Sequence, residues 1–134
     1  MTPRPEADVL RVFVPGIVTN QLNGAQGWHW SRVAKERKEW RARTVTMVRS
    51  RRHEAPFVPT VPKRITFTAH VWSRFDDDSL PATMKSVRDG LIDAGLIHAD
   101  GPTSGHVFEY KQIVDRQRRG VQIEARALVP DGAQ

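Results

Sequence analysis

The chain has 134 residues, a net charge of +6 and no cysteine. Its length predicts one domain with a single modest core, and the missing cysteine excludes disulfides, zinc–thiolate sites and cysteine nucleophiles. No apolar run approaches the length of a membrane span, and the N-terminal segment has no signal-peptide core, so we expect no membrane association and a cytoplasmic location. The positive charge favours polyanionic partners, chiefly nucleic acid.

The first part of the chain predicts a strand and then a long helix. We expect residues 1–7 to be flexible, and Val9–Val14 to form a strand that Pro15 and Gly16 end. Residues 28–52 have an apolar stripe at helical spacing, with Ser31 as the candidate N-cap. The stripe consists of Val33, Trp40, Thr44, Met47 and Val48.

The other faces of this predicted helix are strongly basic. Such a face can follow the phosphates of a DNA backbone, although an ordinary solvent-facing helix has the same pattern. We expect DNA contacts from Arg32, Lys35, Arg37, Lys38 and Arg41.

Residues 63–73 alternate between apolar and polar side chains, which predicts a half-buried strand. Ile65, Phe67, Ala69 and Val71 should face the core. His70 falls on the polar face and is predicted to belong to that face rather than to bind a metal. The strand leads directly into an acidic cluster.

The acidic cluster opens a predicted amphipathic helix that ends at Ala94. Ser79 or Asp78 is the candidate N-cap, Pro81 is tolerated in the first turn, and Gly95 should end the helix as its C′ residue. The buried stripe is predicted to be Met84, Val87, Leu91 and Ala94. The chain then turns back, which should bring Asp100 near the acidic cluster.

Carboxylates gathered at one spot repel each other unless a cation binds them, and hard oxygen ligands suit Mg²⁺ or Mn²⁺. On an extended chain Asp76 and Asp78 point to one side and Asp77 to the other. We therefore assign Asp76, Asp78 and Asp100 to a metal ion and leave Asp77 solvated. Lys85 lies on the flank of the helix, close to the acidic end.

The same segment admits other interpretations. An EF-hand is excluded because Leu80 and Pro81 stand where a ligand and a glycine are required. An acidic loop that caps the helix and binds no metal remains open from the pattern. Lys85 could equally form only an i,i+4 pair with Asp89 on the helix surface.

The rest of the chain predicts two strands, Val107–Val114 and Val121–Leu128, after a turn at Gly101–Gly105. Arg116–Gly120 is predicted to join them as a basic hairpin loop, from which Arg118 and Arg119 should contact DNA. Residues 130–134 are expected to be a flexible tail. The order β-α-β-α-β-β predicts a single α+β domain with two helices packed on a mixed or antiparallel sheet.

The acidic segment resembles the RusA-like Holliday junction resolvases of bacteria and their phages. It matches D-x-D-(N/S)-L at Asp76–Leu80, K-x-x-x-D-G-L-x-x-A-G-x-I at Lys85–Ile97, and a closing aspartate at Asp100. The basic helix is similar to the family's N-terminal half, so that the resemblance covers roughly residues 9–128. The chain departs from the family at Ser79, usually asparagine, and at Ala99, often aspartate.

The resemblance implies a homodimeric, Mg²⁺-dependent endodeoxyribonuclease of DNA recombination and repair, in a bacterial cytosol or a phage-infected host. Such an enzyme binds four-way DNA junctions and nicks two opposing strands, and Mn²⁺ is expected to substitute for Mg²⁺. Carried over by position, Asp76, Asp78 and Asp100 bind the metal and Lys85 is the catalytic lysine. The alternatives are a non-catalytic DNA-binding protein on the same fold and a small structural or adaptor protein.

Overall fold

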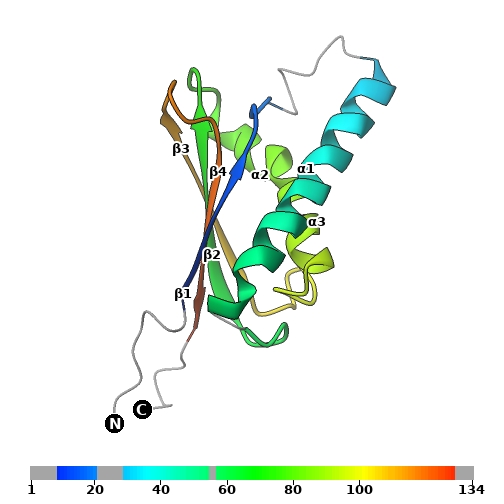
Figure 1. Ribbon diagram of the computed structural model, residues 1–134, viewed down its shortest axis with the longest axis vertical. Helices are drawn as coiled ribbons and strands as arrows, with labels where there is room; N and C mark the ends of the chain where they lie inside the picture. Colours follow the sequence, from blue (N-terminus) through cyan, green and yellow to red (C-terminus); the bar gives the residue numbers. More distant parts are fainter. Residues whose placement is uncertain (1–8, 21–28, 55–56, 129–134) are drawn as a thin grey trace.

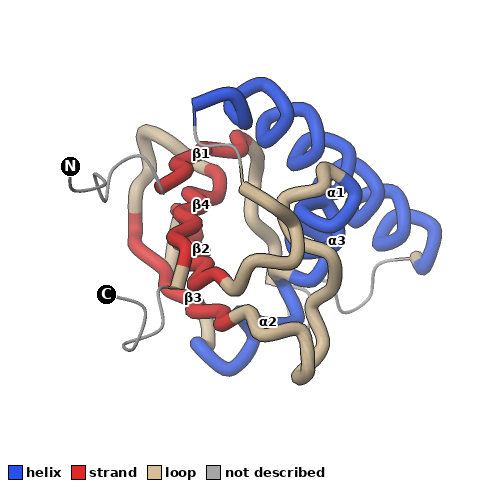
Figure 2. Tube along the Cα trace, turned by 90° about the horizontal axis from the view of Figure 1, so that it is seen from below, coloured by secondary structure: helices blue, strands red, loops and turns tan. Residues whose placement is uncertain are grey.

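The four strands form one sheet, and their alternating apolar residues make one of its faces apolar. The helices pack over that face (Figures 1 and 2). In the computed structural model, which describes residues 9–20, 29–54 and 57–128, the strands are β1 (Val9–Pro15), β2 (Lys63–Val71), β3 (Val107–Val114) and β4 (Gly120–Ala127). Their order across the sheet is β1-β4-β2-β3. The predicted α+β class and element order are confirmed, while the two ends predicted to be flexible lie outside the described residues.

The predicted faces of β2 are also confirmed. Ile65, Phe67 and Ala69 are fully buried against the helices, and His70 lies on the opposite face. No helix within the described ranges covers that opposite face (Figure 2). No helix in the same ranges is both long and apolar enough to span a membrane.

The predicted β3–β4 hairpin is wrong. Strand β4 lies between β1 and β2, antiparallel to both. Among the strands that the structure describes, β3 pairs only with β2 and runs parallel to it. Residues 115–119 therefore cross the end of β2 rather than form a hairpin. Burial explains the arrangement, because Val121, Ile123 and Ala125 of β4 are fully buried, whereas β3 has one buried residue, Gln112, and is suited to a sheet edge.

Helix α1 (Trp30–Arg51) packs against β1 and α3 and is followed by the 3₁₀ turn η2 (Arg52–Glu54). Its N-cap is His29 rather than the predicted Ser31, because the His29 Nδ1 atom accepts the backbone N–H of Ser31 at 3.2 Å. Imidazole nitrogen thus satisfies a helix-terminal donor that a hydroxyl was expected to bind. Of the predicted stripe, Trp40, Thr44 and Val48 are buried and Val33 and Met47 are half-buried.

The second helical segment is broken into three parts: η3 (Asp77–Ser79), α2 (Leu80–Thr83) and α3 (Lys85–Asp93). The prediction of one continuous helix is wrong at Met84, whose φ of −87° and ψ of 1° lie outside the helical region. Ser79 does occupy the N-cap position of α2, but its side chain makes no capping hydrogen bond. The four residues of the predicted stripe are all buried.

Gly95 ends α3 as predicted. Its φ of +79° is in the left-handed region that glycine adopts without steric cost. The backbone N–H groups of Gly95 and Leu96 bond to the carbonyl oxygens of Ile92 and Leu91, each at 3.0 Å, which is a Schellman motif. This tight ending turns the chain back toward Asp100.

A glycine also sets the distance between α1 and α3. A Cβ atom added at Gly90 would lie 2.7 Å from Thr44 Cβ and 2.9 Å from the Arg41 carbonyl oxygen. Both are fixed parts of α1, so that neither can move aside alone. Only glycine at this position allows the two helices to approach so closely.

Lys63, the first residue of β2, is fully buried. Its Nζ atom donates to the carbonyl oxygens of Val58 and Val61 at 2.7 and 2.8 Å. Burial, and to a smaller extent the nearby charge of Arg52, lowers the pKa of Lys63 to about 8. The folded protein therefore releases this proton more easily than the unfolded chain.

This lowered pKa predicts a rise in stability at alkaline pH. Between pH 8 and 10.5 the unfolded chain, with an ordinary lysine pKa of 10.5, binds more protons than the folded protein, so the free energy of unfolding should increase with pH. From pH 8 to 10 we expect a gain on the order of 2 kcal/mol relative to Lys63→Met. Denaturant unfolding of both proteins measures it, and parallel pH profiles would contradict the lowered pKa.

Candidate functional site

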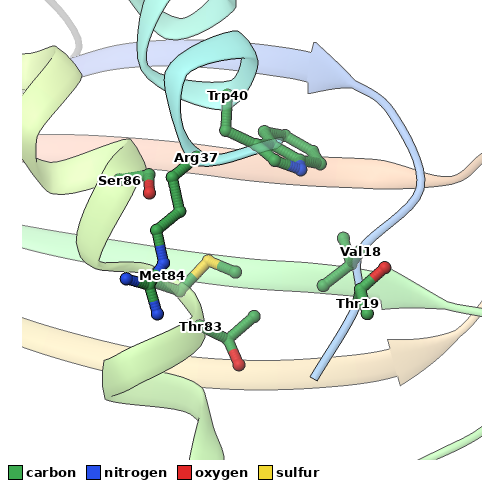
Figure 3. A pocket seen from close by; sticks show the side chains of 7 residues that line it. All are labelled: Val18, Thr19, Arg37, Trp40, Thr83, Met84 and Ser86. Carbon is green, nitrogen blue, oxygen red and sulfur yellow. The ribbon is translucent and has the colours of Figure 1, made fainter. Parts of the chain in front are cut away.

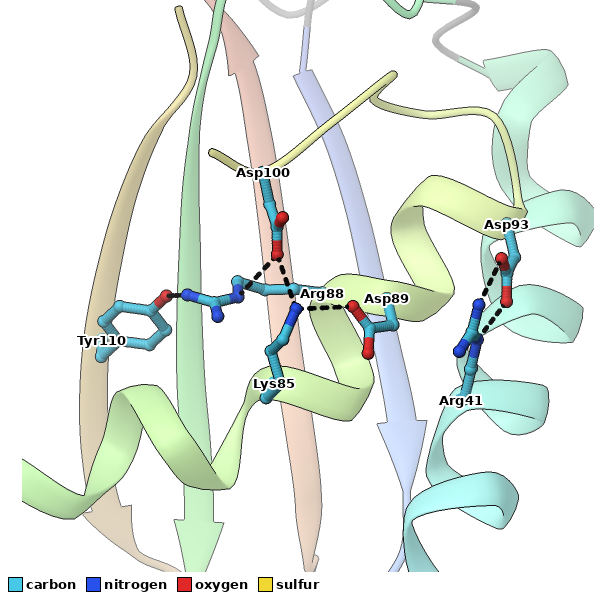
Figure 4. A network of polar contacts seen from close by, with 7 residues as sticks. All are labelled: Arg41, Lys85, Arg88, Asp89, Asp93, Asp100 and Tyr110. Carbon is cyan, nitrogen blue, oxygen red and sulfur yellow. Dashed lines mark hydrogen bonds and ion pairs between the residues drawn. The ribbon is translucent and has the colours of Figure 1, made fainter. Parts of the chain in front are cut away.

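Asp100 lies at the centre of a network of charged side chains beside α3 (Figure 4). Its Oδ2 atom is 3.2 Å from Lys85 Nζ and 3.5 Å from Arg88 Nε. Lys85 Nζ also donates to Asp89 Oδ1 at 3.0 Å. The bond to Asp89 raises the pKa of Lys85, burial opposes it, and the bond to Asp100 adds to it, so that Lys85 keeps its charge. The structure thus brings two predicted catalytic residues, Lys85 and Asp100, into contact.

Arg88 and Tyr110 complete this network and were missed by the sequence analysis. Arg88 Nη1 donates to the Tyr110 hydroxyl at 2.6 Å, which connects α3 to β3. Burial raises the pKa of Tyr110, and the phenol therefore remains a neutral acceptor. The sequence does contain a signal for Arg88. It comes three residues after Lys85, and residues at this spacing share one face of a helix.

The acidic turn that precedes α2 is not extended, which removes the basis for the predicted facing of its side chains. Asp76 has extended backbone, but the 3₁₀ turn η3 begins at Asp77. Asp77 is exposed, yet its Oδ1 atom accepts a bond of 2.5 Å from Gln112 Nε2 and pairs with Arg74. Asp77 therefore anchors the turn through these bonds. Asp76 and Asp78 are exposed as well.

Side chains of strand β3 contact both parts of the predicted metal site, the acidic turn and the Asp100 network. Gln112, which is 5% exposed, also donates from Nε2 to the Phe75 carbonyl at 2.5 Å and accepts the Phe75 N–H at 3.1 Å. Tyr110, two residues earlier on the same face, holds the Arg88–Asp100 pair. Alternate residues of a strand are about 7 Å apart. The acidic turn and the Asp100 network are therefore attached to neighbouring positions of one strand.

The predicted ligand set is not assembled as a three-carboxylate cluster. Within residues 9–20, 29–54 and 57–128, no group of three or more histidine, aspartate or glutamate side chains lies close enough to hold a metal ion. The donor chemistry nonetheless suits Mg²⁺, since all three predicted ligands are carboxylates. Asp100 is compensated by Lys85 and Arg88 in this state, so that metal binding has to compete with two cations.

An open groove of about 560 Å³ runs between α1 and the α2–α3 segment, and we call it the basic groove. One wall carries Lys85 and Asp89, and the other carries Arg37 and Lys38 from α1. Its lining is Ala34, Arg37, Lys38, Arg41, Ala82, Lys85, Ser86 and Asp89. The structure thus places three of the predicted DNA-contacting cations in one groove with the predicted catalytic lysine.

Arg41 has a structural partner in this groove. Its Nε and Nη2 atoms both bond to the carboxylate of Asp93, the latter at 2.9 Å (Figure 4). The hydrogen bond from Arg41 lowers the pKa of Asp93. Arg41 therefore joins α1 to α3, in addition to any contact with DNA.

Arg37 also lines a second, smaller hollow. This cavity, of about 10 Å³, is lined by residues from the segment after β1, from α1 and from the α2–α3 segment (Figure 3). Its volume has room for about one water molecule and not for a ligand. The Arg37 side chain extends across it from α1 toward Met84 (Figure 3).

The remaining predicted DNA contacts lie elsewhere. Arg32 and Lys35 are exposed on α1 but do not line the basic groove. The guanidinium groups of Arg118 and Arg119 lie over the rings of Phe13 and Trp72. Apart from Arg32 and Lys35, the predicted cations therefore lie on two separate surfaces, one between the helices and one at the end of the sheet.

No protein-family model matches the chain, and no curated protein matches it in sequence.

Proposed function

We propose that the protein is a Mg²⁺-dependent, structure-selective endodeoxyribonuclease that resolves four-way DNA junctions by paired nicks in opposing strands. Its role would be in DNA recombination and repair. The observation that carries this proposal is the contact between Lys85 and Asp100 at the wall of the basic groove. A groove with cations on both walls attracts a phosphate backbone. A carboxylate beside that groove could hold a catalytic cation next to the bound phosphate.

The proposed metal ligands are Asp76, Asp78 and Asp100. A divalent cation held there would polarise a scissile phosphate and lower the pKa of a bound water, and Mn²⁺ could replace Mg²⁺. The ammonium of Lys85 cannot fully serve both Asp100 and a substrate phosphate. We propose that it keeps its bond to Asp89 and turns toward the phosphate, where it stabilises developing negative charge.

The positions of Tyr110 and Gln112 support this assignment. Gln112 attaches the acidic turn to β3, and Tyr110 attaches the Arg88–Asp100 pair to the same strand. These bonds reduce the conformational freedom that the ligands would lose on metal binding. Arg88 and Tyr110 are thus proposed as positioning residues for Asp100.

One observation favours an alternative, a non-catalytic DNA-binding protein. Asp100 is already paired with the charges of Lys85 and Arg88, and a protein that only binds DNA would retain such a network. The two functions differ in whether DNA is cut.

A nicking assay tests the proposal directly. With Mg²⁺, a labelled four-way junction should be nicked in opposing strands, whereas linear duplex of the same sequence should remain intact. No nicking of the junction in Mg²⁺ or Mn²⁺, together with tight junction binding, would support the non-catalytic alternative instead.

Paired nicks require two active sites, and this chain supplies one. We therefore propose a two-fold homodimer. A mixed dimer with one Asp78→Asn subunit should nick one strand only. Full resolving activity from a species that light scattering identifies as a monomer would remove the dimer from the proposal.

Binding to the junction should weaken steeply with salt if the basic groove neutralises phosphates. Each lost phosphate contact should flatten the log–log salt dependence by about 0.9, which we expect for Lys38→Ala and for Arg37→Ala. The measurement is junction affinity over a salt series without metal. Arg41→Ala is a poorer test because it also removes the bond to Asp93.

Arg64→Ala is the matched control for charge. Arg64 is exposed at the start of β2, away from the basic groove, and its loss should leave the slope unchanged. Equal slopes for the Lys38 and Arg64 variants would mean that the groove does not hold DNA.

A further inference from the structure

A second surface, at the end of the sheet, combines an exposed tryptophan with arginines. Trp72 directly follows β2 and is 54% exposed. The guanidinium carbons of Arg116 and Arg119 lie 4.9 and 5.3 Å from the centroid of its ring. Arg116 Nε also donates to the Trp72 carbonyl at 3.1 Å. A large apolar ring is thus about half exposed to solvent, with two guanidinium groups lying over part of it.

The loop that carries these arginines is held by Asp115. Its Oδ1 atom accepts the backbone N–H groups of Gln117 and Arg118, both at 3.1 Å. Its Oδ2 atom lies 3.1 Å from His70 Nδ1, and its own N–H donates to the Val71 carbonyl at 2.9 Å. The bond from His70 lowers the pKa of Asp115, which keeps this acceptor ionised. The arginines are therefore presented by a well-bonded loop.

The surface continues onto β1. The Arg118 guanidinium lies 3.7 Å from the centroid of Phe13, whose ring in turn meets His70 edge-on at 5.3 Å. Three arginines in four residues stand over two aromatic rings, and the one carboxylate in this loop, Asp115, is engaged by His70. Such a surface is complementary to a polyanion that also has flat rings.

We propose that Trp72 and the arginines around it bind an unpaired nucleobase of DNA. The base stacks on the exposed ring, while Arg116 and Arg119 donate from their edges to the flanking phosphates. A guanidinium can stack on an aromatic face and still donate in its plane, and stacking on aromatic side chains with cationic support is the usual means of holding single-stranded nucleic acid.

The position of this surface links it to the candidate catalytic site. Trp72 precedes Asp76 by four residues, so their Cα atoms are at most about 14 Å apart. A base stacked on Trp72 would therefore lie within a few nucleotides of a phosphate at the acidic turn. The inference rests on the proposed function only in taking DNA as the partner, since unpaired bases occur where strands exchange.

The test compares two oligonucleotides of equal length and charge, an oligothymidylate and the same backbone with abasic residues. Binding to the full chain is measured by fluorescence anisotropy in a chelator, so that nothing is cut. We expect the base-bearing strand to bind about tenfold more tightly. Trp72→Ala should abolish that ratio and Trp72→Phe should keep most of it, while Arg116→Gln should weaken binding of both strands.

Ile113→Ala is the matched control, because Ile113 is an exposed apolar residue on the neighbouring strand and should leave the ratio unchanged. Equal affinity of the unmodified protein for both strands, or an unchanged ratio in a folded Trp72→Ala protein, would overturn the inference. The result is independent of nicking. A base preference in a protein that cuts no junction would retain this inference while removing the nuclease proposal.

Discussion

Replacement of Asp100 by asparagine should lower the rate of junction nicking at least about a hundredfold. Asparagine preserves the size of the side chain but removes a strong ligand and the negative charge that faces Lys85 and Arg88. Binding of the junction without metal should persist or tighten, because the change also removes repulsion between a carboxylate and the phosphates. Nicking rate and gel-shift affinity, measured on the same preparation, separate the two effects.

The same comparison applies to the other proposed site residues. Asp76→Asn and Asp78→Asn should behave like Asp100→Asn, and Lys85→Ala should lose cutting but retain metal binding in calorimetry. Asp77→Asn is the control, since an asparagine Oδ1 can still accept the bond from Gln112 and nicking should stay near normal. Near-normal cutting by Asp100→Asn would remove Asp100 from the site, and an equally large loss in Asp77→Asn would show that the turn itself was damaged.

Replacement of Gly90 by alanine should destabilise the fold by about 2 kcal/mol. The added methyl group would overlap Thr44 and the backbone of Arg41, and overpacking of this kind typically costs about 1–3 kcal/mol, more than the helix propensity that alanine adds. Because α1 must move outward, the basic groove should widen and junction affinity should also fall. Thermal or denaturant unfolding gives the change in stability.

Gly101→Ala provides the same substitution in open space. Apart from its two chain neighbours, no atom of the described residues lies within 4 Å of a Cβ atom built at Gly101, and the change should leave the free energy of unfolding nearly unaltered. Unfolding curves of the Gly90 and Gly101 variants that coincide would show that α1 and α3 are not in contact at Gly90.

Local sequence patterns were sufficient to predict the elements that bury one face. The alternation in β2 predicted which of its side chains are buried, and the stripe from Met84 to Ala94 predicted the packed face of α3 despite the break at Met84. Gly95 was predictable because only a left-handed residue ends a helix in this way. These features depend on neighbours in the chain.

Features that depend on distant partners were not predictable in this way. Nothing near Gly120 indicates that β4 inserts between β1 and β2 instead of pairing with β3. The bonds of Asp77 with Gln112 and of Arg88 with Tyr110 join residues more than 20 positions apart. Lys63 has the residue type of a surface position, and only the carbonyl groups of the preceding loop make its burial possible.

The central place of β4 has a consequence for how the chain acquires its structure. The sheet order β1-β4-β2-β3 means that β1 meets no other strand until β4 arrives, and β4 ends at Ala127. While the ribosome is still making the preceding residues, β1 and one edge of β2 have unpaired backbone groups, and such edges invite pairing with other chains. The sheet can therefore close only after β4 has been synthesised, and a nascent chain stalled before residue 120 would be a substrate for chaperones.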